Sequence, residues 1–185
     1  MIKDKQLKEK IGIEISQDIL ENPHKPVYLG IGSNVGNRIN NINYACYLLN
    51  NFCSISKVSN YYETNSWPNE NYPKYLNVIL KCKTKLNPFS LINKLKNIEK
   101  KLGRKKNIKN SPRTCDIDII DFKGIEFKEK NLQIPHPSLT KRNFVLLPLY
   151  EIEKRWIHPK TNTTIDKLIK NLDIKSLRSI KIFKK

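Results

Sequence analysis

Residues 113–122 read RTCDIDIIDF and combine an apolar strand pattern with two aspartates two positions apart. Because side chains alternate along a strand, Asp116 and Asp118 project from one face, while the apolar residues between and beside them project from the other. A buried carboxylate is costly unless a positive group compensates it. The stretch therefore predicts a sheet strand that brings two carboxylates together beside a positive charge or a metal ion.

The residues around this strand predict the remaining elements. Asn87 and Pro88 are typical of an N-cap and a first helical position, and Gly103 suits the end of the same helix. Alternation in YLNVILKCK predicts a half-buried strand. The expected order is a strand at 27–31, a helix at 39–49, an extended segment at 54–63, a strand at 75–83, a helix at 88–102, the aspartate strand, and a less regular tail with a short helix at 163–172. This order indicates an α+β, ferredoxin-like fold: a mainly antiparallel sheet with helices packed on it.

The chain length is that of one domain, since 185 residues can bury a substantial core without disulfides or metal. Residues 1–25 are charged and end in ENPHKP, whose two prolines mark a break. We expect an N-terminal extension at 1–25 and a single domain at 26–185. No stretch resembles a signal peptide or a membrane span, and the four cysteines form no C-x-x-C pair. These features predict a cytoplasmic protein with reduced thiols, and we expect a monomer.

The charge balance is strongly basic, with a formal net charge of +18. Such a balance alone favours a polyanionic partner such as nucleic acid. However, arginine occurs only six times, and the positive charge comes mainly from lysines spread through the whole chain. A dedicated nucleic-acid-binding module is therefore an alternative and not the favoured interpretation.

The two aspartates match what Mg²⁺ requires. This ion binds one or two carboxylates and completes its octahedron with water and phosphate oxygens. The alternative is that the aspartates face solvent on an edge strand and pair with lysines. Arg113 adjoins the strand, and a basic segment with Arg104 and Lys106 precedes it, so cations that bind phosphate lie nearby. This segment is either a solvated charge run or a mobile lid over a nucleotide.

Two further groups of residues are candidates for ligand binding. His136 lies between two prolines and close to Arg142, which suits a phosphate contact, although a lone histidine is also often structural. Tyr75 and Asn77 share a strand face, where a ring and an amide can bind a flat heterocycle or simply form a polar sheet face. The stretch GIGSNVGN at 30–37 lacks the pattern of a P-loop or of a dinucleotide fingerprint.

A resemblance to a known family rests on six motifs. In chain order they are GIGSNVGNR, YYETNSW, YLNVIL, IEKKLGR, SPRTCDIDII and IPHPSLTKRNFVLLPL. Together, over residues 26–155, they resemble the 6-hydroxymethyl-7,8-dihydropterin pyrophosphokinases of folate biosynthesis. The resemblance implies a ferredoxin-like fold and transfer of diphosphate from ATP to the pterin hydroxymethyl group, with release of AMP.

The resemblance also implies roles for individual residues. Asp116 and Asp118 would hold two Mg²⁺ ions, and Arg104 and Arg113 would act with them in catalysis. The implied ATP contacts are Glu99, Lys106, Arg113, His136 and Arg142. The implied pterin pocket consists of Thr64, Tyr75, Asn77 and Phe144. One departure is that the family's Trp-Gly before the Pro-Arg pair is replaced by Asn110-Ser111.

Two other functions fit parts of the sequence. Another Mg²⁺-dependent, nucleotide-using transferase could use the same aspartate pair, but it would not require the pterin pocket. A basic nucleic-acid-binding module would bind any strand with steep salt dependence and would consume no ATP.

Overall fold

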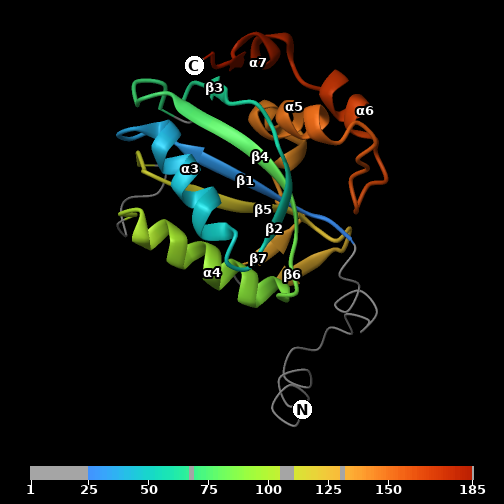
Figure 1. The fold of residues 1–185 in the computed structure, drawn as a ribbon. Coiled ribbons are helices and arrows are strands. Elements are labelled where there is room, and N and C mark those ends of the chain that lie inside the picture. Colours follow the sequence, from blue (N-terminus) through green and yellow to red (C-terminus); the bar gives the residue numbers. More distant parts are fainter. Residues whose placement is uncertain (1–24, 67–68, 105–110, 130–131, 185) are drawn as a thin grey trace.

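The computed structural model describes residues 25–66, 69–104, 111–129 and 132–184, and Figure 1 shows a sheet flanked by helices. Its central sheet consists of β1 (Val27–Ser33), β2 (Ser54–Val58), β3 (Tyr62–Thr64), β4 (Tyr75–Lys83), β5 (Asp116–Phe122) and β8 (Lys181–Ile182). The strand order is β5-β1-β4-β3-β8, with β2 also on β4, and every pair is antiparallel. The predicted α+β class is confirmed. The extension predicted at 1–25 lies outside the described residues except for Lys25.

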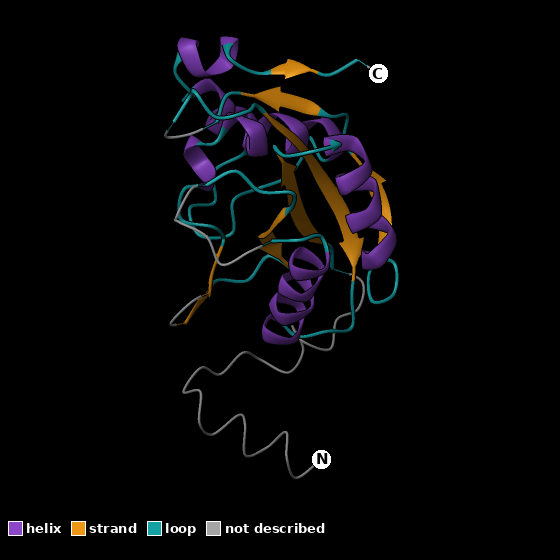
Figure 2. Cartoon of the chain, turned by 90° about the vertical axis from the view of Figure 1, so that its left-hand side faces the viewer, coloured by secondary structure: helices purple, strands orange, loops and turns teal. Residues whose placement is uncertain are grey.

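The helices lie on both faces of the sheet, as the side view of Figure 2 shows. On one face are α3 (Arg38–Leu49) and α4 (Pro88–Lys101), and on the other is α5 (Asn143–Ile152). The remaining elements are β6 (Phe127–Glu129) and β7 (Leu132–Ile134), which form a hairpin, a short 3₁₀ helix (Leu139–Lys141), α6 (Ile165–Lys170) and α7 (Ile174–Arg178). The less regular tail expected after β5 therefore contains several elements, of which α6 matches the predicted short helix.

Helix α4 begins and ends as its sequence predicts. The side chain of Asn87 accepts a hydrogen bond from the Ser90 backbone N–H at 2.8 Å, and Pro88 occupies the first turn, where no N–H is needed. Gly103 has a φ of +83°, a left-handed conformation that ends a helix at little cost for glycine. The apolar stripe that includes Leu91 and Leu95 is fully buried. These local signals end α4 at Lys101, shortly before Arg104.

Two hydrophobic cores share the sheet. The larger core packs α3 and α4 against residues such as Leu29, Val78 and Ile117. The smaller core packs α5 and α6 against Tyr28, Ile79 and Ile120. Because α5 covers only part of its face, the rest of that face is open to a cavity.

The prediction that β4 is half-buried is wrong. Asn77 and Ile79, on the face expected to be polar, are only 7% and 1% exposed. The alternation correctly places them opposite Leu76 and Val78, but α5 packs on the second face and buries Ile79. Alternation along a strand reports which side chains share a face, whereas the burial of that face depends on distant segments.

Three of the four cysteines, Cys53, Cys82 and Cys115, are buried, and all four are free thiols. No helix in the described part of the chain has the length and apolarity that spanning a membrane would require.

Candidate active site

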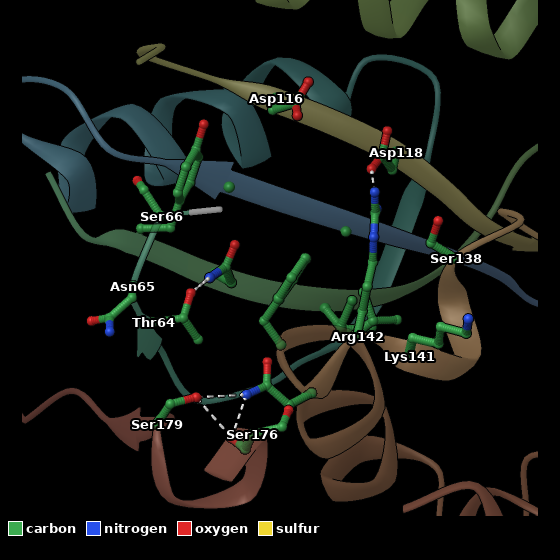
Figure 3. Close-up of a pocket in the computed structure, with 18 of the residues that line it drawn as sticks. Thr64, Asn65, Ser66, Asp116, Asp118, Ser138, Lys141, Arg142, Ser176 and Ser179 are labelled. Carbon is green, nitrogen blue, oxygen red and sulfur yellow. Dashed lines mark hydrogen bonds and ion pairs between the residues drawn. The ribbon is translucent and has the colours of Figure 1, made fainter. Parts of the chain in front are cut away.

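A cavity of about 770 Å³ lies between the open part of the sheet and the first turn of α5 (Figure 3). Eight residues proposed from the sequence line it: Thr64, Tyr75, Asn77, Arg113, Asp116, Asp118, Arg142 and Phe144. They come from β3, β4, β5, the segment before β5 and the turn that begins α5. The structure therefore gathers the expected phosphate-binding and ring-binding residues in one cavity.

The aspartate pair has the geometry predicted from strand alternation. Asp116 and Asp118 both line the cavity, whereas Ile117 and Ile119 are buried in the larger core on the opposite face. Each carboxylate faces an arginine. Arg104 and Arg113 donate to Asp116 at 2.6 and 3.2 Å, and Arg142 donates to Asp118 at 3.3 Å, a pair visible in Figure 3.

The arginines keep Asp116 ionised. Burial alone would raise the pKa of this carboxyl, but the positive charges of Arg104 and Arg113 outweigh burial and lower its pKa below the ordinary value. An ionised carboxylate accepts hydrogen bonds only and is a ligand for hard cations. Asp116 is thus in the form that metal binding requires.

Glu99 holds Arg104 next to Asp116 but does not itself line the cavity. Its side chain is only 1% exposed, and its Oε1 atom accepts hydrogen bonds from the Ile117 backbone N–H at 2.8 Å and from Arg104 at 2.5 Å. Lys96 binds its other oxygen at 3.1 Å. Because Arg104 bridges Glu99 and Asp116, the buried carboxylate orients the arginine.

The residues expected to bind a ring lie on the same sheet face, across β1 from the aspartates, and form the candidate ring-binding slot. Asn77 and Thr64 are buried on neighbouring strands, and the Asn77 Nδ2 atom donates to Thr64 Oγ1 at 3.1 Å. Tyr75 is paired with Thr64, and its ring lies over Gly32 of β1, where an added Cβ atom would be 3.4 Å from it. Across the cavity, the Arg142 guanidinium lies 5.5 Å from the centre of the Phe144 ring. Arg142 therefore links the carboxylate end to the aromatic slot.

Two glycines of β1 form the floor of the cavity between the aspartate pair and the candidate ring-binding slot. In the central strand β1, Gly30 pairs with Asp118 on one side and Ile79 on the other, and Gly32 pairs with Asp116 and Asn77. Both glycines line the cavity. Because both glycines lack a side chain, Ile79 and Ile120 approach Gly30 closely, and Asn77 and Tyr75 approach Gly32. Sequence reasoning missed this role when it tested the glycines only against nucleotide-binding motifs.

Asn34, also from the glycine-rich stretch, fixes the cavity wall. The Asn34 Oδ1 atom accepts from the Arg113 backbone N–H at 2.7 Å, and the Asn34 backbone N–H donates to the Arg113 carbonyl at 3.1 Å. Its Nδ2 atom donates to Ser66 Oγ at 3.2 Å. One buried amide therefore connects the segment that carries Arg113 to the loop that follows Thr64.

Of the remaining predicted ATP contacts, His136 does not line the cavity. His136 lies in the turn before the 3₁₀ helix, and its Nδ1 atom accepts a hydrogen bond from the Ser138 backbone N–H at 3.1 Å. Burial and the neighbouring charge of Arg142 lower its pKa, which favours the neutral imidazole. Lys106 lies outside the described residues, as does most of the basic segment that contains it.

The cavity also includes residues that the sequence did not single out. They are Asn65, Ser66, Glu70, Ser138, Lys141 and Asn143, together with Asp173, Lys175, Ser176 and Ser179 from the C-terminal segment. Lys141 could have been found, because it is a cation next to Arg142 in the motif IPHPSLTKRNFVLLPL. The C-terminal residues carry no recognisable pattern, since only tertiary packing brings them to the site.

The donor set fits Mg²⁺ bound together with phosphate. Among the described residues, no group of three or more His, Cys, Asp or Glu side chains is arranged to hold an ion. Asp116 and Asp118 nevertheless offer carboxylate oxygens to the cavity, with side chains 29% and 37% exposed. Mg²⁺ commonly takes one or two carboxylates and fills its other positions with water and substrate oxygens, so two aspartates suffice.

Comparisons with known proteins identify relatives. A family model described as 7,8-dihydro-6-hydroxymethylpterin-pyrophosphokinase matches residues 28–154. The chain is 48% identical over 133 residues to a 2-amino-4-hydroxy-6-hydroxymethyldihydropteridine pyrophosphokinase of Aquifex aeolicus, covering 72% of this chain and 83% of that protein. It is 39% identical over 127 residues to the protein of the same name from Bacillus subtilis, covering 68% and 76%. A folic acid synthesis protein of Dictyostelium discoideum is 38% identical, but the match spans only 22% of its length.

Solved structures agree on the fold. A Plasmodium falciparum HPPK-DHPS crystallised with pteroate superposes with a TM-score of 0.68 at 19% identity, covering 90% of this chain and 48% of that one. An HPPK-DHPS in complex with substrates gives a TM-score of 0.66 at 18% identity, covering 80% and 43%. The chain thus corresponds to about half of these longer proteins. At this identity the likeness shows the ferredoxin-like fold.

Proposed function

Because this chain belongs to the 7,8-dihydro-6-hydroxymethylpterin-pyrophosphokinase family, we propose that it transfers diphosphate from ATP to the hydroxymethyl group of 6-hydroxymethyl-7,8-dihydropterin in folate synthesis. The products are AMP and the pterin diphosphate. The observation that carries this proposal is the joint presence, in one cavity, of an arginine-flanked carboxylate pair and a slot bounded by Tyr75 and Phe144.

The slot suits the pterin. A flat bicycle can stack on Tyr75 and Phe144, while the Asn77 amide, which both donates and accepts, binds the polar edge of the ring. Thr64 holds that amide in place by accepting one of its hydrogens. The glycine floor of β1 leaves room for the ring next to the two carboxylates.

Asp116 and Asp118 are the residues that would hold magnesium, and we propose two ions with ATP. When bound, Mg²⁺ neutralises phosphate oxygens and lowers the pKa of the attacking hydroxyl. The acidic pair takes part as ionised carboxylates, the state in which the arginines already keep Asp116.

The arginines supply the remaining charge. Arg113 and Arg142 now bind the carboxylates, and in the ternary complex they donate to phosphate oxygens instead. Arg104 also binds Asp116, and its ion pair with the buried Glu99 holds it in position. Glu99 therefore acts on ATP through this arginine. Lys106 adds a further cation. Such groups accelerate phosphoryl-type transfer by positioning and by stabilising developing charge.

Although His136 does not line the cavity, we propose that its imidazole acts as a hydrogen-bond donor. Since Nδ1 accepts a hydrogen bond from Ser138, the proton of the neutral ring resides on Nε2, which can donate to a phosphate oxygen. Lys141 and Ser138 line the cavity near Arg142, as Figure 3 shows, and we propose that they also contact phosphate.

The bond changes are those of a direct displacement. The pterin hydroxyl oxygen attacks the β-phosphorus of ATP, the bond from that phosphorus to the oxygen bridging the α-phosphate breaks, and AMP departs with the electron pair. The hydroxyl proton leaves to solvent. Positioning of the two substrates in one cavity supplies much of the rate increase by removing the entropy cost of their encounter.

We also propose that residues 26–185 act as one pyrophosphokinase domain of a cytoplasmic monomer. The single domain is supported by the sheet that both hydrophobic cores share.

The deciding experiment is an assay of AMP formation from ATP with the pterin present and absent. We expect AMP only when ATP, the pterin and Mg²⁺ are all present, in equal amount to the pterin diphosphate. AMP formation that does not depend on the pterin would contradict the proposal. Omission of Mg²⁺ with excess chelator is the matched control for the metal.

A further inference from the structure

The C-terminal segment returns to the active-site cavity after α6. Four of its residues line the cavity: Asp173, Lys175, Ser176 and Ser179. The match to the family model ends at residue 154, so this wall belongs to a part of the chain that the match does not cover. In Figure 3, Ser176 and Ser179 lie at the end of the cavity opposite Asp116 and Asp118.

One buried amide joins this segment to α5. The Asn143 side chain, 7% exposed as a residue, donates from Nδ2 to the Ser176 carbonyl at 2.6 Å and to Ser179 Oγ at 3.2 Å. The Ser179 hydroxyl in turn donates to the same Ser176 carbonyl at 2.8 Å. Asn143 directly precedes Phe144, so the amide connects the C-terminal segment to the residue that bounds the ring-binding slot.

The segment is anchored on the opposite side of the slot as well. β8 pairs with β3 through Tyr62 with Ile182 and Glu63 with Lys181, and β3 ends at Thr64. The Phe183 backbone N–H donates to the Tyr61 carbonyl at 2.7 Å. The C-terminal segment thus spans from the Phe144 side of the slot to the Thr64 side.

The polar atoms where the C-terminal segment meets Asn143 already form hydrogen bonds within the protein. The Ser176 N–H donates to Asp173 Oδ1 at 2.6 Å, and the Ser176 carbonyl accepts from both Asn143 and Ser179. A wall whose hydrogen bonds are satisfied internally holds shape, and it has little capacity left at those atoms to bind a ligand.

We propose that residues 173–183 form a wall that sets the width of the pterin slot, and that Asn143 is the positioning residue that holds this wall against Phe144. The inference rests on the proposed function, since it assigns the slot to the pterin. It concerns the pterin more than ATP, because the wall and the aspartates lie at opposite ends of the cavity (Figure 3).

The first test is kinetic. Asn143→Asp keeps the shape of the side chain but replaces the donor with an acceptor that faces the Ser176 carbonyl. We expect the KM for the pterin to rise about tenfold, the size of one lost hydrogen bond, while the KM for ATP stays within about twofold, since the change leaves the phosphate end intact. Ser179→Ala should raise the pterin KM by a smaller factor.

The matched control is Asn40→Asp, the same chemical change at an exposed position of α3 on the other face of the sheet. It should leave both KM values unchanged. Equal increases in both KM values, or none, for Asn143→Asp would overturn the inference, and thermal unfolding of both variants shows whether the fold is retained.

The second test needs no catalysis and uses the unaltered chain. Trypsin can cleave after Lys175 and Arg178, and a ligand that packs against the wall should protect these sites. We expect 6-hydroxymethyl-7,8-dihydropterin to slow cleavage there severalfold and ATP alone to have little effect. No protection by the pterin would overturn the inference even if the enzyme is active. A chain that forms no AMP yet shows pterin protection would contradict the proposed function and support the wall.

Discussion

The Cβ atom that Gly32 lacks would lie 3.0 Å from the Oδ1 atom of Asn77. The same atom would lie 3.4 Å from the Tyr75 ring. Gly32 pairs with Asn77 on β4 and with Asp116 on β5, so it separates the ring-binding residues from the carboxylate pair. The lack of a side chain at Gly32 therefore allows Asn77 and Tyr75 to take their positions in the cavity.

Gly32→Ala should weaken pterin binding. The added methyl group would displace the Asn77 amide or the Tyr75 ring, because the contact of 3.0 Å is shorter than the usual carbon–oxygen approach. We expect the dissociation constant for the pterin, measured by calorimetry, to rise at least tenfold, equivalent to about 1.4 kcal/mol. Unaltered pterin affinity would show that the ring does not lie over β1. Gly36→Ala tests a glycine outside the cavity, where backbone strain is the main effect expected.

Asp116→Asn should abolish most activity without unfolding the protein. The amide has nearly the same shape, but it lacks the charge that would bind Mg²⁺ and that now pairs with Arg104 and Arg113. We expect AMP formation to slow by about 10²–10³, the range seen when one electrostatic contact to a transition state is removed. Asp166→Asn, at an exposed position of α6, is the matched control. Wild-type turnover in Asp116→Asn would refute the metal assignment.

Phe144→Ala should affect the pterin more than ATP. Its ring bounds the proposed pterin slot, whereas the residues proposed to bind phosphate lie around Asp118 and Arg142. Loss of an aromatic stacking partner costs about 0.5–1.5 kcal/mol beyond lost burial, which predicts a severalfold or larger increase in the pterin dissociation constant. Calorimetry with each ligand separately measures the difference. Equal losses for both ligands would argue against the slot, and Tyr47→Ala, at a largely exposed ring on α3, provides the control.

His158 should make stability depend on pH. Its ring is buried, and Nδ1 accepts hydrogen bonds from the Lys160 and Thr161 backbone N–H groups at 3.2 and 3.3 Å, which only the neutral form allows. Burial lowers its pKa, so the unfolded chain binds a proton more readily than the folded one. Stability is thus fully present above the unfolded pKa of about 6.5 and falls as the pH decreases through that value.

The measurement for His158 is urea unfolding at pH 7.5 and at pH 5.5. The wild-type protein should lose more unfolding free energy between these values than His158→Asn, which keeps an acceptor but has no imidazole to titrate. Parallel losses in the two proteins would assign the pH dependence to other groups. His136 is present in both proteins, so its contribution cancels in the comparison.

Local patterns in the sequence predicted a large part of the fold. Strand alternation placed Asp116 and Asp118 on one face, and the N-cap and glycine signals at Asn87 and Gly103 gave the ends of α4. These features depend on interactions within a few residues, so the sequence alone contains them. The eight cavity residues named from the sequence were reached partly through motifs whose spacing resembled a family, and not through physical reasoning alone.

Other features depended on packing between distant segments. No helix was predicted at 143–152, where the sequence has a continuous apolar run, yet burial against the sheet stabilises α5 even with Pro148 inside it. The burial of Ile79 follows from that helix.

The sequence by itself determined which side chains share a strand face and where the local capping residues begin and end a helix. Only the tertiary structure decided that Gly32 forms a floor, that Glu99 supports Arg104 from below, and that Asn143 joins the C-terminal segment to the cavity. The physical reason is range: alternation and capping act over two to four residues, whereas the contact between Asn143 and Ser176 joins residues 33 positions apart in the chain.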